Sequence, residues 1–295
     1  MKKLPAYTTP LGYAWHYFYL FICALIFFIL IAPILIIIPL SFNAESFFTF
    51  TEAMLRLDPD AFSLKWYRQL LQSPYRPGDT SEWVIAAQNS FFVATVVTIL
   101  ATSLGTLAAM GLSRPGMPFR RSVMALLLSP LIVPIIITGV GMFLFYSKLH
   151  MTYTYTGLIL THTALATPFV VVTVTATLVG FDNSYIRASY GLGANPLTTF
   201  FRVVLPLIFP GVVTGALFAF VTSLDEVVVA TFLAGPEQTT LPMHMLAGLR
   251  QEINLSILAV ATILTVLSVL LLTVVELLRR RNEKLTANRP GLASH

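Results

Sequence analysis

Residues 181–206 read FDNSYIRASYGLGANPLTTFFRVVLP and form a polar interruption between two apolar spans. The interruption has the pattern of two short helices joined by a hinge. The triplet Asp-Asn-Ser at 182–184 offers oxygens that accept the free N–H groups at the start of the first helix. Gly191 and Gly193 favour the end of that helix. Asn195-Pro196 then reads as a cap followed by proline at the first helical position, which predicts a second helix.

The composition of the chain indicates a membrane protein. Of its 295 residues, 56% are hydrophobic and only 11% are charged, whereas globular chains average about 25% charged residues. The single cysteine, Cys23, lies in an apolar run and excludes a disulfide framework.

Six stretches are long enough to cross a bilayer, which takes about 20 apolar residues. They lie at 17–39, within 84–112, within 122–147, at 158–179, at 210–235 and at 253–275. The sequence therefore predicts an all-α polytopic protein with six transmembrane helices and a short cytoplasmic helix between spans four and five. Pro130 and Pro134 favour a kink in the third span. The pattern Gly211-Val-Val-Thr-Gly215 predicts close helix contacts.

The lysines and arginines orient the chain, because cytoplasmic loops carry an excess of them. With the N-terminus inside, 12 of the 18 are cytoplasmic: Lys2, Lys3, Arg114, Arg120, Arg121, Arg187, Arg202, Arg279, Arg280, Arg281, Lys284 and Arg289. The other six are external: Arg56, Lys65, Arg68, Arg76, Lys148 and Arg250. Both termini and residues 182–206 are therefore expected in the cytoplasm.

The external segment 42–83 is long for a connection between spans. Leu64, Tyr67, Leu70 and Leu71 recur there at helical spacing behind Ser63, a residue type that caps helices. This pattern predicts a short helix on the outer surface of the membrane, with Trp66 and Tyr67 at headgroup level.

The spacing within the polar interruption resembles a motif of binding-protein-dependent ABC importers. Their membrane subunits carry Glu-Ala-Ala, three residues, Gly, nine residues, Ile, any residue and Leu-Pro. The matching positions are Arg187, Ala188, Ser189, Gly193, Val203, Leu205 and Pro206. The resemblance implies that residues 182–206 are a coupling helix, which sits in a groove of a separate ATPase. Arg187 reverses the charge of the family's glutamate, so the family's salt bridge is not implied here. The alternative is an ordinary cytoplasmic loop.

An acidic pair, Asp225-Glu226, lies in the fifth span. A charged residue there costs about 2.5–3.5 kcal/mol on insertion scales, so it should face protein or water. Adjacent helical positions point about 100° apart, so we expect one acid to line a transport route and the other to pair with a neighbouring helix. A structural ion pair, or a span that ends early, is the alternative.

The residues around this pair resemble the spermidine/putrescine branch of the same permeases. FVTSLDEVVVATF at 220–232 contains that branch's Ser-x-Asp-Asp/Glu segment, and LILTHTALATP at 158–168 is also similar. The resemblance covers approximately residues 84–275. It implies a polyamine as cargo and a substrate route that includes Ser223, Asp225 and Glu226. Permeases for other amines, opines, amino-acid-like solutes and organophosphonates share these motifs.

Nothing in the sequence predicts an enzyme. None of the lysines ends a P-loop motif, and the histidines and Cys23 have no metal-ligand spacing. We expect a non-catalytic inner-membrane subunit, without a cofactor, that works with four partners: an ATPase dimer carrying ATP and Mg²⁺, a second, homologous permease, an external solute-binding protein and membrane lipid. Nucleic acid is not implied. Two other classes compete: a secondary transporter in which Asp225, Glu226 and His162 couple protons to cargo, and a membrane assembly protein without cargo.

The same reasoning divides the chain into three parts. Residues 1–83 form an N-terminal tail, the first span and the external loop. Residues 84–279 form the permease domain, which includes the coupling loop 182–206, and residues 280–295 form a basic cytoplasmic tail.

Overall fold

The computed structural model describes residues 9–72, 80–114, 116–251 and 254–287. Regular secondary structure in these residues is helical apart from one isolated antiparallel bridge between Asn43 and Phe62. The all-α prediction is therefore confirmed. The chain divides into two units, one formed by Met1–Leu70 and Ile253–Val269, the other by Leu71–Glu252 and Leu270–His295.

Five of the described helical segments are long and apolar enough to cross a membrane. They are α1 (Pro10–Leu40), α4 (Glu82–Leu112), α7 (Tyr155–Val179), the run Pro196–Asp225, and Ser256–Thr273 in α13 (Ser256–Ala287). These helices lie close to five of the six stretches predicted from hydropathy.

The third predicted span is broken. It consists of α5 (Arg120–Leu128) with the 3-10 turn η2 (Ser129–Leu131), followed by α6 (Ile135–Lys148). The two parts are bent by 97° and make a sixth span if the pair counts as one. Pro130 lies in η2, and Pro134 comes directly before α6. Because proline lacks the N–H that continues a helix, these residues account for the bend.

The first unit contains a compact turn that follows α1. It holds α2 (Glu52–Leu55), η1 (Pro59–Ala61) and α3 (Lys65–Leu71). The predicted external helix is α3, and the Ser63 hydroxyl accepts a hydrogen bond from the Lys65 N–H. The sequence predicted Trp66 at headgroup level but did not predict its contacts within the chain. Its ring is buried, and its Nε1–H donates to the Asn43 carbonyl at 2.8 Å.

Asn43 explains why Trp66 turns inward. The side-chain amide of Asn43 is buried and donates to the carbonyls of Phe47 and Thr49, at 2.9 Å and 3.2 Å. Its Oδ1 accepts the backbone N–H of Glu45 at 2.9 Å. These bonds fold residues 43–49 into a turn whose backbone carbonyl is available to the indole.

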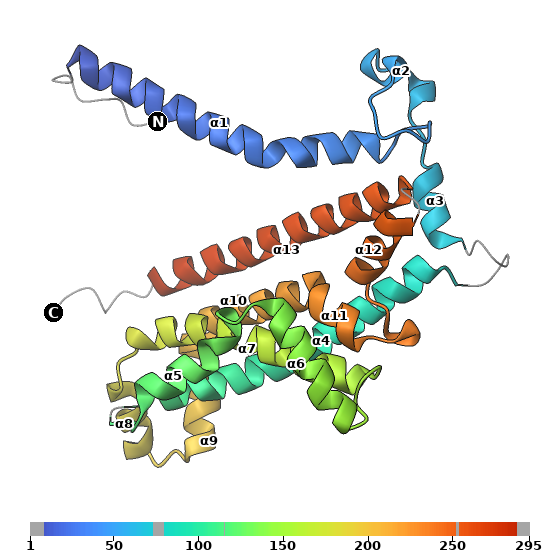
Figure 1. The fold of residues 1–295 in the computed structure, drawn as a ribbon. Coiled ribbons are helices and arrows are strands. Elements are labelled where there is room, and N and C mark those ends of the chain that lie inside the picture. Colours follow the sequence, from blue (N-terminus) through green and yellow to red (C-terminus); the bar gives the residue numbers. More distant parts are fainter. Residues whose placement is uncertain (1–8, 73–79, 115, 252–253, 288–295) are drawn as a thin grey trace. The chain divides into compact units, whose positions relative to one another are not determined.

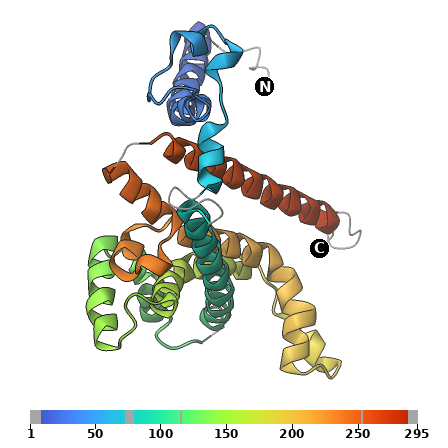
Figure 2. The ribbon, with the colours of Figure 1, turned by 90° about the vertical axis from the view of Figure 1, so that its right-hand side faces the viewer.

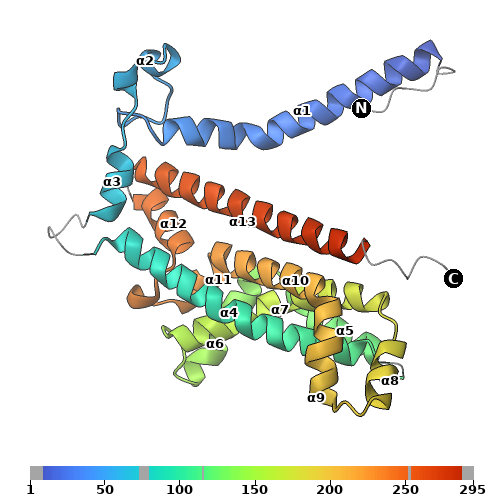
Figure 3. The same ribbon diagram turned by 180° about the vertical axis from the view of Figure 1, so that it is seen from behind.

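The second unit is built on three helices, α4, α7 and α10 (Leu205–Asp225), which run side by side (Figures 1 and 3). Their shared core consists of small and β-branched side chains that are fully buried: Val97, Ala101, Ala166, Val170, Val174, Ile208 and Ala219. Such residues let helix backbones approach closely, as expected for helices that pack inside a membrane.

Glycines make the closest contacts in this core. A Cβ atom on Gly105 of α4 would lie 2.6 Å from the Cβ of Val170 in α7. A Cβ on Gly215 of α10 would lie 2.6 Å from the Thr173 Oγ1 and 3.0 Å from the Val170 Cα. Gly211 also lies against α7, at Thr177. The predicted close contacts of Gly211 and Gly215 are therefore confirmed, and they lie within this chain.

The remaining elements lie at the two ends of the three-helix core. Beyond α10 follow α11 (Val228–Leu233), η4 (Pro236–Gln238) and α12 (Leu241–Gln251). Between α7 and α10 lie α8 (Ser184–Gly191), α9 (Pro196–Thr199) and a π-helical turn, η3 (Phe200–Val204). Figure 2 shows this yellow segment projecting from one end of the second unit. It is the polar interruption of the sequence.

Candidate functional site

The interruption at 182–206 forms the expected pair of short helices. Asp182 opens the first of them: its Oδ1 accepts the Ser184 N–H at 2.8 Å, and its Oδ2 accepts the Ser184 hydroxyl at 2.6 Å. Gly193 has φ +80°, a left-handed conformation that glycine adopts without strain. Asn195 then caps α9, since its Oδ1 accepts the Thr198 N–H at 2.8 Å. The predicted start, hinge and second start are all confirmed.

A buried hydrogen bond joins the two short helices. The hydroxyls of Ser189 in α8 and Thr199 in α9 are 2.9 Å apart, and both side chains are buried. From sequence, Ser189 was only a small replacement for the motif's second alanine. The sequence feature that could have indicated this bond is the pair of hydroxyl residues ten positions apart, on either side of the hinge at Gly193. The bond makes α8 and α9 one connected piece.

The outer surface of this piece is exposed and partly apolar. Leu192 and Leu197, on either side of the hinge, have 90% and 70% of their surface exposed. Arg187, Ala188 and Gly193 are also exposed. Both leucines are therefore accessible at the surface of the loop.

The rest of the motif connects the loop to the core. Val203 is half-buried in η3, Leu205 and Pro206 begin α10, and the neighbouring Val204 and Ile208 are buried in the core. The loop therefore continues directly into the base of α10.

Asp182 has a lowered pKa. The first cause is the hydrogen bond from the Ser184 hydroxyl and the second is that from the Ser184 N–H, while the positive charge of Arg187 contributes least. The stabilisation that follows is present above the carboxyl's unfolded pKa and is lost as the pH falls through the lowered folded value.

The acidic pair lies where α10 ends. Asp225 is its last residue and is exposed, whereas Glu226 is buried and has extended backbone. The Oε1 of Glu226 accepts the Val229 N–H at 2.8 Å, so its carboxylate caps the short helix α11. The fifth span was predicted to continue to residue 235. Its helix ends at Asp225 instead, because the cap starts a new helix.

Ser223 and His162 form a buried pair between α10 and α7. The Ser223 Oγ lies 3.0 Å from the His162 Nδ1, and both side chains are buried. His162 is thus a hydrogen-bonded packing residue in this structure. The structure places Ser223 two residues from Asp225 but inside the helix contact, while Asp225 faces outward.

A set of hydrogen bonds that the sequence did not suggest, called the clasp below, fixes the loop after α11 to α4 and α7. The Asn89 amide of α4 donates to the carbonyls of Glu237 and Thr239, both at 2.9 Å. The Tyr155 hydroxyl of α7 lies 2.8 Å from the Asn89 Oδ1 and 3.0 Å from the Glu237 carbonyl. Ser90 accepts the Leu241 N–H at 2.7 Å. The only sequence signal was an Asn-Ser pair inside an apolar span.

Replacing Asn89 by alanine is expected to free this loop locally. The change removes two donated bonds, at a cost of about 1 kcal/mol for each. The Thr239 carbonyl loses the Asn89 donor, whereas the Glu237 carbonyl keeps the Tyr155 hydroxyl. Amide hydrogen exchange across residues 235–241 should accelerate several-fold, while exchange in α7 and α10 stays unchanged. Gln88→Ala, at the exposed neighbouring position, is the control. Equal acceleration in both variants would contradict the clasp.

No group of three or more His, Cys, Asp or Glu side chains that could hold a metal ion occurs among the described residues. The candidate site consists of the loop at 182–206, its direct connection to α10 and the exposed Asp225 at the far end of that helix.

Comparison with known proteins identifies the class. Residues 101–284 match the family described as binding-protein-dependent transport system inner membrane component, and the chain belongs to this family. It is a multi-pass inner-membrane permease subunit of an ABC importer and not an enzyme. Such importers also contain an ATPase and a solute-binding protein.

Two curated relatives cover most of the chain. The spermidine/putrescine transport system permease protein PotC of Haemophilus influenzae is 31% identical over 250 residues, which is 85% of this chain and 91% of PotC. The putrescine transport system permease protein PotI of Escherichia coli (strain K12) is 32% identical over 272 residues, covering 90% and 89%.

Two solved structures share the fold. A bacterial ABC transporter involved in the import of the acidic polysaccharide alginate has a chain that matches with a TM-score of 0.67 at 16% identity, covering 94% of this chain and 99% of that one. The MetNI methionine ABC transporter matches with a TM-score of 0.55 at 21% identity, covering 67% and 94%.

Proposed function

We propose that this chain forms half of the membrane route for a small cationic organic solute, a polyamine such as putrescine or spermidine. The observation that carries the proposal is the identity of 31% and 32% to permeases named for these solutes. The exposed carboxylate of Asp225, at the end of α10, supports it. A carboxylate forms charge-assisted hydrogen bonds with ammonium groups and so replaces part of their water shell.

Energy reaches the route through residues 182–206. In this proposal the exposed leucines of the loop, Leu192 and Leu197, sit in a groove of the ATPase, beside Arg187 and Ala188. ATP and Mg²⁺ bind to the ATPase and not to this chain. The Ser189–Thr199 bond supports such a role, since it lets α8 and α9 move together. Val203, Leu205 and Pro206 pass the movement to α10.

The other half of the route is a second permease subunit, which we infer to be a homologue. The solute-binding protein delivers cargo on the external side, at the clasped loop near residues 235–242. Both termini and the coupling loop are cytoplasmic, because 12 of the 18 lysines and arginines then lie inside. Closure of the ATPase dimer opens the route outward, and hydrolysis of ATP returns it to the inward-open state.

Reconstitution tests this function. The chain and the subunits that co-purify with it are reconstituted in liposomes. The binding protein is added outside, and uptake of labelled putrescine is measured. We expect uptake with ATP inside and none with a proton gradient alone. Uptake driven by the gradient without ATP would identify a secondary transporter instead. Transport of an organophosphonate or an amino acid, without transport of putrescine, would support the importer function and show that the cargo is not a polyamine.

Arg187 gives a separate test of the coupling surface. The side chain is exposed and makes no ion pair with the described residues, so its charge is available to an acidic group on the ATPase. Arg187→Glu should lower binding-protein-stimulated ATP hydrolysis about fivefold, since replacing attraction by repulsion at a partly exposed pair costs roughly 1 kcal/mol. Arg187→Lys, which keeps the charge, should retain most of the stimulation. Full stimulation in Arg187→Glu would remove the residue from the contact.

A further inference from the structure

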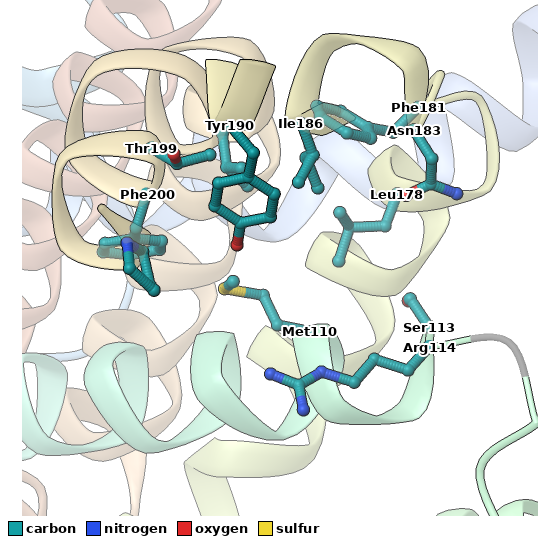
Figure 4. A pocket seen from close by; sticks show the side chains of 12 residues that line it. Met110, Ser113, Arg114, Leu178, Phe181, Asn183, Ile186, Tyr190, Thr199 and Phe200 are labelled. Atoms are coloured by element: carbon teal, nitrogen blue, oxygen red, sulfur yellow. The ribbon is translucent and has the colours of Figure 1, made fainter. Parts of the chain in front are cut away.

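A cavity of about 320 Å³ lies between the coupling loop and the ends of two membrane helices (Figure 4). Its floor is the last turn of α4, with Met110, Ser113 and Arg114, and its wall includes Leu178 and Phe181 just before and after the end of α7. The coupling loop covers it through a set of residues from α8 to η3: Asn183, Ile186, Tyr190, Pro196, Thr199, Phe200 and Val204. The volume is in the range of small-molecule sites in proteins.

The lining separates into two kinds of surface. Met110, Leu178, Ile186 and Phe200 provide apolar walls. Figure 4 shows the Tyr190 side chain reaching toward Met110 from the loop, and the Arg114 guanidinium extending beneath Met110 from the end of α4. The cavity is therefore apolar with a positive group at its border.

Four polar side chains of the border are unpaired within the part of the chain that the structure describes, whereas Thr199, which also lines the cavity, is bonded to Ser189. Among the described residues, no hydrogen bond or ion pair is formed by the side chains of Ser113, Arg114, Asn183 or Tyr190. The carboxylate nearest in sequence, Asp182, is already bonded to Ser184. These side chains can all donate hydrogen bonds, and Arg114 adds a positive charge, which is an arrangement suited to an anion.

The position of the cavity selects the kind of anion. α4 and α7 both cross the membrane, and the cavity lies where they end, at Leu112 and Val179. Lipid headgroups are found at this level, with apolar chains beside them. Basic pockets between membrane helices on the cytoplasmic side bind anionic headgroups. A soluble anion would leave the apolar walls uncovered.

We propose that this cavity binds an anionic phospholipid of the inner leaflet, with its phosphate at Arg114 and Tyr190 and the start of an acyl chain against Ile186 and Leu178. The assignment to the inner leaflet rests on the proposed orientation of the chain. A lipid bound here touches both α4 and α8. It therefore stabilises one position of the coupling loop relative to the membrane helices.

Native mass spectrometry tests the site without transport or ATP hydrolysis. The full chain, with its co-purifying subunits, is transferred from delipidating detergent into detergent that contains phosphatidylglycerol, phosphatidylethanolamine or inorganic phosphate. Phosphatidylglycerol adducts should persist. Arg114→Gln should reduce their occupancy about fivefold, as expected for one basic residue at an anionic surface, and Tyr190→Phe should reduce it less.

Arg120→Gln is the matched control, because Arg120 is an exposed arginine at the start of α5 that does not line the cavity. Unchanged adducts in Arg114→Gln, or an equal loss in Arg120→Gln, would overturn the proposal. Retention of inorganic phosphate but not of phosphatidylglycerol would show that the cavity binds a soluble anion and not a lipid. Because binding is read directly, these outcomes are separate from failure of the importer function.

Discussion

Replacing Gly215 by valine is expected to destabilise the three-helix core of the permease. A Cβ there would lie 3.0 Å from the Cα of Val170 and 2.6 Å from the Oγ1 of Thr173. The backbone of α7 cannot move away without opening the contact with α4, because Gly105 packs against the same Val170. Overpacking of this kind costs about 1–3 kcal/mol. The midpoint of thermal unfolding in detergent should fall by several degrees, with a lower yield of monodisperse protein.

Gly111→Val is the matched control for this prediction. Gly111 also lies in a membrane helix, α4, but a Cβ there meets no atom within 4 Å. Both changes make the same replacement, and valine is no worse a helix former than glycine. If the two variants lost equal stability, the loss would not come from the contact between α7 and α10.

Asp225→Asn is expected to lower uptake of putrescine at least tenfold in the reconstituted importer, while expression and assembly stay normal. A hydrogen bond to a charged group contributes roughly 1.5–3 kcal/mol, and a loss of 1.4 kcal/mol is tenfold in affinity. Asp225 is exposed, and its side chain accepts no hydrogen bond from the described residues. Initial uptake rates at several putrescine concentrations would measure the effect.

Substitutions of Glu226 distinguish an effect on transport from an effect on folding in the same experiment. Glu226→Gln keeps an oxygen that can accept the Val229 N–H, so the cap of α11 should remain. Glu226→Ala removes the cap and should cost about 1 kcal/mol of stability. Asp60→Asn, at an exposed acid in η1 and outside the proposed route, controls for general loss of negative charge. Normal uptake in Asp225→Asn would exclude this carboxylate from the route.

The sequence predicted those parts of the fold that depend on local patterns. Hydropathy located the long helices, since a membrane helix needs an uninterrupted apolar run. Local backbone chemistry located Gly193 and Asn195, because a left-handed turn and a helix cap depend on a few adjacent residues. Pro130 and Pro134 predicted a kink in the third span, but they did not predict its angle of 97°.

The parts that could not be predicted depend on partners distant in sequence. Trp66 is buried because Asn43 turns the chain toward it, and the Asn89 clasp joins residues about 150 positions apart. The end of α10 at Asp225 depends on the direction of the Glu226 side chain, which hydropathy does not contain. The roles of the coupling residues and of Asp225, Glu226 and Ser223 in transport stay predictions.

The π-helical turn η3 affects the angle at which the two short helices are joined to α10. A π-turn accommodates one residue more than the α-helix around it, and each helical residue contributes about 100° of rotation. The number of residues between Gly193 and Leu205 therefore determines an angle as well as a length. It sets the rotational phase at which the two short helices join α10, and hence the side of α10 on which they lie relative to Asp225 at its far end.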